Sequence, residues 1–438
     1  MALMKVTRTR AIGLLGGLVL TAGTVMPAAL AAPAASAASH VITTSGGLFG
    51  QARWVTTWAA SPQQAVPGSP AAAGFDDQTV RNIVFTSVGG DVARVRLTNT
   101  FGTSSLAVGH VTLAVAGAGA AAVPGTVHRV TFFGSASVSI PAGAQVLSDP
   151  VRMRVPALQD LAVSVYLPHA TGPATNHSDA QQVNWVAAGD HAADQGAGAF
   201  TTQVQSWYFV DGVTVPSHRA FGTVVAFGDS ITDGFQSTVG ANARWPNDLA
   251  RRLDARPGFT LSVADEGISG NRVLTSDECC GVSALNRLQR DVLDQAGVRD
   301  VILLEGINDF GFSVLPPNPV INPVTDVSAQ QVIAGYEHII AVAHARGLRI
   351  FGATLTPFKG ASYYSAAGEQ KREAVNAWIR TSGAFDGIID FDHVVRDPSD
   401  PLVINPAYDS GDHLHPNDAG YQAMANAIDL EMLLRGRR

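Results

Sequence analysis

The stretch Val224-Val225-Ala226-Phe227-Gly228-Asp229-Ser230-Ile231-Thr232 decides the fold of this 438-residue chain. Its apolar first half is typical of a buried strand, and Gly-Asp-Ser ends that run abruptly. Thr232 and Asp233 follow and are suited to cap a helix, so we predict a tight strand-to-helix turn at Ser230. Such a turn exposes a serine hydroxyl and places its N–H near a helix N-terminus, where negative charge is favoured. Taken alone, the stretch also fits an ordinary capped junction.

Strands and helices alternate in the sequence from residue 222 onward. This alternation predicts a doubly wound parallel sheet, in which ligands bind beyond the carboxyl ends of the strands. Ser230 would then lie on the functional edge of the sheet. The predicted strands are residues 223–227, 260–264, 300–304, 348–355 and 387–391, and the predicted helices are residues 244–255, 283–295, 328–346, 368–382 and 416–435.

Residues 51–220 have a different pattern, in which apolar and polar residues alternate. Ala93, Val95 and Leu97, for example, are separated by single arginines. This period of two, broken by Gly, Pro and Asn turns, predicts short antiparallel strands in a β-sandwich. Four tryptophans of this region could form a sugar-stacking surface or could simply pack in the core: Trp54, Trp58, Trp185 and Trp207.

The N-terminus predicts a secretory signal peptide over residues 1–37. Three basic residues precede an apolar stretch, and small-residue cleavage sites follow at 29–31 and 35–37. A Ser/Gly-rich linker over 38–50 would lead into the β-rich domain at 51–220, and the α/β domain would cover 221–438. No later segment is apolar enough to span a bilayer. We therefore expect a secreted, extracellular protein.

The overall charge and the cysteines limit the functions of the chain. The formal net charge of −7 gives no electrostatic case for nucleic acid or an anionic membrane surface. Cys279 and Cys280 are the only cysteines and are adjacent, which excludes a disulfide framework. In an oxidising compartment they could form a vicinal disulfide, which we favour over two free thiols.

Polar clusters follow the second and third predicted strands, at residues 265–272 and 305–309, and another precedes the last predicted helix, at residues 409–417. Hydrolysis of an ester by a serine needs a base, a partner that orients the base, and donors for the developing oxyanion. His415 could take the proton of Ser230, and Asp412, three residues earlier, could hold the other ring nitrogen. The Gly270 N–H, the Asn308 amide and the N–H of Ser230 itself could be the oxyanion donors.

Each of these residues also has a simpler interpretation. Asp412 and His415 could cap a helix or bind a metal, but no histidine pair with zinc-site spacing accompanies them, so we predict no metal site. Gly270 and Asn308 could be plain turn residues. Asp233 and Asp309 are interpreted as turn-stabilising or capping residues.

Together the four blocks resemble the SGNH, or GDSL-type, hydrolase superfamily over about residues 222–436. The matching blocks are Gly228-Asp229-Ser230, Gly270 within Ile268-Ser269-Gly270-Asn271, Gly306-Ile307-Asn308-Asp309, and Asp412-His413-Leu414-His415-Pro416. The resemblance implies a three-layer αβα flavodoxin-like fold, a Ser-His-Asp triad and an oxyanion hole from Ser230, Gly270 and Asn308. It implies no cofactor. With a β-domain in front, the layout looks like actinobacterial extracellular esterases grouped with acetyl-xylan-type enzymes.

We therefore expect a secreted serine esterase that acts on O-acyl or acetyl esters, for example on a polysaccharide. A lipase or phospholipase is the alternative, because the aromatic loops at 310–326 and 357–367 fit either substrate class. A non-catalytic polysaccharide-binding protein on a hydrolase scaffold is a further alternative, which the complete set of motif residues disfavours. The expected partner is an ester substrate, without stable membrane insertion, and the sequence does not specify an oligomeric state.

Overall fold

The computed structural model describes residues 52–316 and 319–435, so the predicted signal peptide (1–37) and linker (38–50) lie outside the described residues. The described residues belong to one compact unit, Gly50–Arg438. The division into domains at 51–220 and 221–438 stays a prediction. No helix in the described part of the chain is long and apolar enough to cross a membrane.

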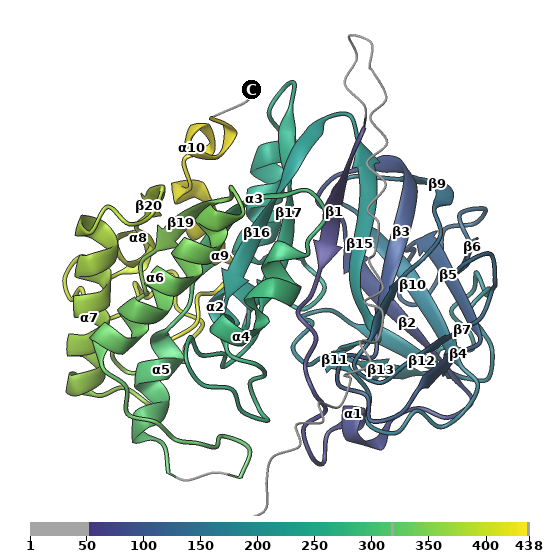
Figure 1. The fold of residues 1–438 in the computed structure, drawn as a ribbon, viewed down its shortest axis with the longest axis horizontal. Coiled ribbons are helices and arrows are strands. Elements are labelled where there is room, and N and C mark those ends of the chain that lie inside the picture. Colours follow the sequence, from purple (N-terminus) through teal and green to yellow (C-terminus); the bar gives the residue numbers. More distant parts are fainter. Residues whose placement is uncertain (1–51, 317–318, 436–438) are drawn as a thin grey trace, which may run out of the picture. The chain divides into compact units, whose positions relative to one another are not determined.

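The first half of the described chain is a sandwich of two antiparallel sheets, which confirms the predicted β-rich fold (Figure 1). Inward-facing residues of both sheets share one core, including Val95 and Val213 from the first and Val84 and Val163 from the second. One sheet contains β1 (Arg53–Ala59), β15 (Val210–Ser217), β3 (Gly90–Thr98), β8 (Gln145–Leu147) and β9 (Val151–Val155). The other contains β13 (Thr202–Val204), β12 (Asn184–Ala188), β2 (Gln78–Phe85), β10 (Asp160–Leu167), β5 (His110–Val115) and β6 (His128–Val130).

Three short pieces complete this half. They are the pair β11 (Asn176–His177) and β14 (Trp207–Tyr208), the pair β4 (Leu106–Val108) and β7 (Val138–Ile140), and the single-turn helix α1 (Pro70–Ala73). Trp58 and Trp207 pack edge to face with ring centroids 5.1 Å apart, and both are buried. These two tryptophans are therefore core residues and do not form a sugar-stacking surface.

The second half is built on a parallel sheet with the strand order β17-β16-β18-β19-β20. Since β16 comes first in the chain, this order is 2-1-3-4-5, the flavodoxin-like arrangement, and the predicted fold class is confirmed. The chain reverses direction across the sheet between β16 and β18, and ligands bind at the carboxyl ends of strands at such a point. The strands are β16 (Ala220–Gly228), β17 (Thr260–Gly267), β18 (Val298–Leu304), β19 (Arg349–Ala353) and β20 (Gly387–Ile389).

Helices cover both faces of this sheet. α3 (Trp245–Asp254), α8 (Phe391–Val395) and α9 (Asp418–Ala427) pack together, and α4 (Ala284–Leu288), α6 (Ala329–Ala345) and α7 (Ala366–Thr381) form a second group (Figure 1). The remaining helices are α2 (Ser230–Asp233), η1 (Gln289–Leu293), α5 (Ile307–Gly311), η2 (Phe312–Val314) and α10 (Leu430–Leu434).

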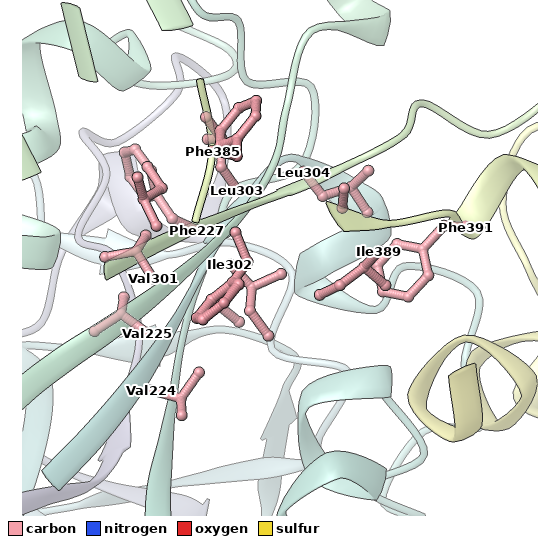
Figure 2. Packing of buried hydrophobic residues seen from close by; sticks show 14 of the residues in the cluster. Val224, Val225, Phe227, Val301, Ile302, Leu303, Leu304, Phe385, Ile389 and Phe391 are labelled. Atoms are coloured by element: carbon pink, nitrogen blue, oxygen red, sulfur yellow. The ribbon is translucent and has the colours of Figure 1, made fainter. Parts of the chain in front are cut away.

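Burial on both faces explains why the strands read as continuous apolar runs. Val224, Val225 and Phe227 of β16 are fully buried and pack with residues of β18, as Figure 2 shows. Complete burial of each such side chain contributes roughly 1.5–3 kcal/mol. Packing in the core therefore fixes the position of the end of β16 and of Ser230, which follows this strand.

Two predicted helices differ from the observed ones. The helix predicted over 416–435 was wrong, because Ile428 leaves the helical conformation and Asp429 caps a separate helix, α10. The helix predicted over 283–295 begins as α4 and continues as the π-helix η1.

Candidate active site

Ser230 lies at the first position of α2, directly after β16, as the strand-to-helix turn predicted. Asp229 caps the helix, and its Oδ1 accepts a hydrogen bond from the Ile231 N–H at 3.0 Å. Position 228 needs glycine, because a Cβ there would lie 2.1 Å from the Leu304 carbonyl oxygen. The tight turn therefore follows from the residues on both sides of the serine.

His415 and Asp412 approach Ser230 from the loop before α9. The His415 Nε2 lies 2.8 Å from the Ser230 Oγ, and the His415 Nδ1 lies 2.6 Å from the Asp412 Oδ2. The Asp412 Oδ1 accepts the backbone N–H groups of Leu414 and His415 at 2.9 and 2.8 Å. The aspartate is thus fixed by the turn that carries the histidine.

The charge on Asp412 determines the tautomer of the imidazole. Burial raises the pKa of Asp412, but hydrogen bonds from the His415 side chain and backbone outweigh it and hold this pKa below its usual value. An ionised carboxylate only accepts hydrogen bonds, so the His415 Nδ1 carries the proton. The lone pair of Nε2 therefore faces the Ser230 hydroxyl, as a general base requires.

Gly270 and Asn308 border the same cavity as Ser230. Gly270 has a φ of +77°, and a Cβ there would lie 2.4 Å from the Cys280 Sγ. The Asn308 Nδ2 donates to the Asn271 carbonyl at 3.0 Å, and its Oδ1 accepts from the Tyr363 hydroxyl at 3.0 Å. Among the described residues the second N–H of this amide has no hydrogen-bond partner, so it can bind an oxygen in the cavity.

The cavity around Ser230 has a volume of about 280 Å³. Its walls are partly apolar, and the Phe235 ring packs edge to face on the His415 imidazole with centroids 4.8 Å apart. Cys279 and Cys280 are bonded to each other and form part of the wall. The full lining is Ser178, Asp179, Ser230, Phe235, Ser269, Gly270, Cys279, Cys280, Asn308, Phe312, Tyr363, Leu414 and His415.

Comparison with known families identifies the part of the chain that carries this site. Residues 226–423 match the model of the GDSL-like lipase/acylhydrolase family. This part of the chain is therefore similar to GDSL-type hydrolases. The segment contains all four blocks, from Ser230 to His415, and its description agrees with the predicted enzyme class.

Solved structures similar to this part of the chain include three hydrolases. One is a variant of Axe2, an acetyl xylan esterase from Geobacillus stearothermophilus, with 18% identity and a TM-score of 0.39 over 50% of this chain and 98% of that one. A GDSL-like lipase from Bacteroides thetaiotaomicron has 18% identity and a TM-score of 0.36 over 48% and 88%. LAE5, an enzyme from the metagenome of Lake Arreo, has 21% identity and a TM-score of 0.37 over 48% and 93%. No curated protein matches this chain.

Arg287 supports the candidate active site through buried hydrogen bonds. This buried guanidinium donates to the Gly228 carbonyl at 2.8 Å, to the Glu266 carbonyl at 2.7 Å and to the Asn271 Oδ1 at 2.9 Å. It therefore ties the ends of β16 and β17 to the residue whose carbonyl holds the Asn308 amide. Asn271 belongs to the second block of the sequence, whereas nothing in the sequence singled out Arg287.

The two aspartates interpreted as turn residues have separate roles. Asp309 accepts the N–H groups of Val273 and Leu274 at 2.7 and 3.2 Å, so it stabilises the loop that follows Gly270. Asp233 is fully buried and binds His177 of the β-rich part, which the sequence did not indicate.

One group of residues in the described chain has potential metal ligands close together, namely Asp277, Cys279 and Cys280. The two sulfurs are joined in a disulfide, whereas a metal binds the free thiolate. Asp277 instead pairs with Arg272 at 2.7 Å and accepts the Cys280 N–H at 2.7 Å. This group is therefore suited to shape the loop and not to bind a cation. His413 also lies apart from the cavity, with its Nδ1 2.6 Å from the Asp409 carboxylate.

The sequence missed several residues of the cavity. Tyr363 and Phe312 belong to the two aromatic loops noted above, but no pattern indicated that they face the serine. Ser178 and Asp179 come from the β-rich half, more than forty residues before the first block. Their approach to Ser230 depends on how the two halves pack, which no local pattern encodes.

Proposed function

We propose that this protein is a secreted serine esterase that hydrolyses short O-acyl esters of a polar alcohol. The observation that carries the proposal is the chain of contacts from Asp412 through His415 to the Ser230 Oγ, at 2.6 and 2.8 Å. This is the arrangement that activates a serine for acyl transfer.

In the proposed reaction, the Ser230 Oγ attacks the acyl carbonyl while the His415 Nε2 takes the hydroxyl proton. The ionised Asp412 stabilises the resulting imidazolium. The N–H groups of Ser230 and Gly270 and the Asn308 amide bind the tetrahedral oxyanion. His415 then gives its proton to the leaving alcohol, and a water molecule repeats the sequence on the acyl-enzyme to release the acid.

The cavity supports a small acyl group and a polar alcohol. Its volume of about 280 Å³ is at the lower end of the range for ligand sites. Asp179 and Ser178 line the cavity with polar atoms, as a hydroxyl-rich alcohol such as an acylated carbohydrate requires. The apolar wall of Phe235, Phe312 and Leu414 favours the alternative, a lipase or phospholipase. Rates on acetylated xylan, tributyrin and a phospholipid, measured with one preparation, would distinguish the two.

The proposal of secretion rests on the sequence of residues 1–37, and mass spectrometry of the mature N-terminus after expression in a secreting host tests it. Cleavage after Ala31 or Ala37 is expected. An uncleaved chain retained with the cells would contradict it.

The activity is tested with p-nitrophenyl acetate and two variants, Ser230→Ala and His415→Ala. Each should lower kcat by at least ~10⁴-fold, because the triad residues act as a unit. His413→Ala is a matched control two residues from His415 and should keep the wild-type rate. Wild-type turnover by folded Ser230→Ala protein would refute the proposed function.

A further inference from the structure

A buried chain of hydrogen bonds runs from the β-rich half to the loop that carries Gly270. His177 lies at the end of β11, and its Nδ1 is 2.9 Å from the Ser61 carbonyl oxygen. Its Nε2 is 3.0 Å from the Asp233 Oδ1. The Asp233 Oδ2 in turn accepts the backbone N–H and the hydroxyl of Ser269, both at 3.2 Å. The side chains of His177 and Asp233 are 3% and 4% exposed.

The partners of His177 determine its protonation. A carbonyl oxygen faces one ring nitrogen and the Asp233 carboxyl group faces the other, so an imidazole that donates from both nitrogens fits this site. Burial lowers the pKa of His177, but Asp233 and the hydrogen bonds to Asp233 and Ser61 outweigh it, and the pKa lies above its usual value. The raised pKa favours the protonated imidazole beside Asp233.

Asp233 connects two parts of the candidate active site. It ends α2, one turn after Ser230, and its carboxylate holds the backbone of Ser269, the residue before Gly270. The Asn271 N–H bonds the Ile268 carbonyl at 3.0 Å, so residues 268–271 form a β-turn. The φ of +77° at Gly270 matches the third residue of a type II turn. In that turn the orientation of the Ser269–Gly270 peptide sets the direction of the Gly270 N–H.

We propose that His177 and Asp233 are positioning residues, which hold the 268–271 turn so that the Gly270 N–H points at the oxyanion. The β-rich half then contributes to the active site through the side chain of His177. This inference rests on the proposed esterase function. It assigns the two residues no contact with the substrate.

Two variants of similar size separate positioning from simple support of the fold. The amide nitrogen of His177→Gln can take the place of Nε2 and keep the bond to Asp233. The amide of His177→Asn is one carbon shorter, so it can replace Nδ1 at Ser61 but does not reach Asp233. Turnover of p-nitrophenyl acetate is measured for both, with kcat expressed per active site by burst titration, so that unfolded protein does not count.

We expect His177→Asn to lower kcat by about 10-fold or more with KM within about 3-fold of wild type, because a misplaced oxyanion donor weakens the transition state and not the bound substrate. His177→Gln should stay within about 3-fold in both constants. His110→Asn, which alters the exposed pair of His110 and Asp190, is the matched control and should match the wild type. Equal kcat values for the Asn and Gln variants of His177 would overturn the inference, as would a change in KM alone.

The same comparison can be made from the carboxylate. In Asp233→Asn the amide oxygen can still accept the Ser269 N–H while its nitrogen donates to a neutral His177, so kcat should be largely retained. Asp233→Leu removes both contacts and should lose about 10-fold or more. If Asp233→Asn and Asp233→Leu have the same kcat, the positioning role is wrong. This comparison also decides the question if neither His177 variant folds. The Ser230→Ala variant is measured in parallel. Only a Ser230→Ala variant that keeps its activity would count against the esterase function itself.

Discussion

Replacing Asp412 with asparagine is expected to impair turnover more than replacing it with alanine. The reason lies in the three bonds that the carboxylate accepts. The Oδ1 of an asparagine would keep the N–H groups of Leu414 and His415, which now lie at 2.9 and 2.8 Å. Its NH₂ group would then face the His415 Nδ1, so the imidazole would carry its proton on Nε2, where it cannot accept the proton of Ser230.

The size of the effect follows from these contacts. Rotating the asparagine amide by half a turn would break two backbone hydrogen bonds of about 1 kcal/mol each. It would also place the NH₂ group against the N–H groups of Leu414 and His415. In the productive tautomer the His415 Nδ1 carries the proton. In the asparagine variant this tautomer lacks the charge-assisted bond to the carboxylate, worth about 1.5–3 kcal/mol, and adds a repulsion of comparable size between the Nδ1–H and the NH₂ group. A total of about 3–6 kcal/mol lowers kcat by about 10²–10⁴-fold. Asp412→Ala loses all three bonds, but its imidazole can choose either tautomer, so only the lost charge-assisted bond weakens the productive tautomer and about 10–10²-fold is expected.

Steady-state kinetics on p-nitrophenyl acetate, with melting temperatures as a check on folding, measure both variants. The asparagine variant should be the slower of the two by about 10-fold or more. If Asp412→Asn is as fast as Asp412→Ala, or faster, then the hydrogen bonds at Oδ1 do not fix the tautomer and the reasoning is refuted.

Two further predictions concern single buried groups. Tyr363→Phe removes the donor to the Asn308 Oδ1, and we expect kcat to fall by about 3–10-fold with KM unchanged in steady-state kinetics, as for the loss of one hydrogen bond; a rise in KM alone would contradict an orienting role. Burial raises the pKa of Asp265 to about 7. Above pH ~4 the folded state therefore binds more protons at this residue than the unfolded chain does. As the pH rises, Asp265 consequently lowers the free energy of unfolding. Asp265→Asn should therefore gain about 2–4 kcal/mol of stability relative to wild type between pH 5 and pH 8 in denaturant titrations, and a difference independent of pH would refute this.

The parallel sheet could be predicted because its physical cause is local in the sequence. Strands buried on both faces must be apolar throughout, as Val224–Phe227 are, and helices between them have an apolar stripe. The break at Ile428 was missed because apolar residues continue across it, so the periodicity does not show where the helix ends.

The candidate site also contains residues that the sequence could predict and residues that it could not. Ser230, Gly270 and Asn308 each follow a strand end of one sheet edge, so their convergence could be expected from the topology. Asp412 and His415 lie in the loop before α9, and only the motif indicated that they approach Ser230. His177, Asp179 and Tyr363 reach the same place through packing between distant segments. Their sequence neighbourhoods contain no periodic or motif signal, and only the folded chain shows their contacts.

The central claim is that the Ser230 hydroxyl is the nucleophile, and covalent capture tests it most directly. Diethyl p-nitrophenyl phosphate should release p-nitrophenol from the wild-type protein and leave one diethylphosphoryl group, which peptide mass spectrometry should locate on Ser230. The label should be absent from Ser230→Ala and should form much more slowly in His415→Ala. A label on another residue, or no label on a protein that hydrolyses p-nitrophenyl acetate, would contradict the account.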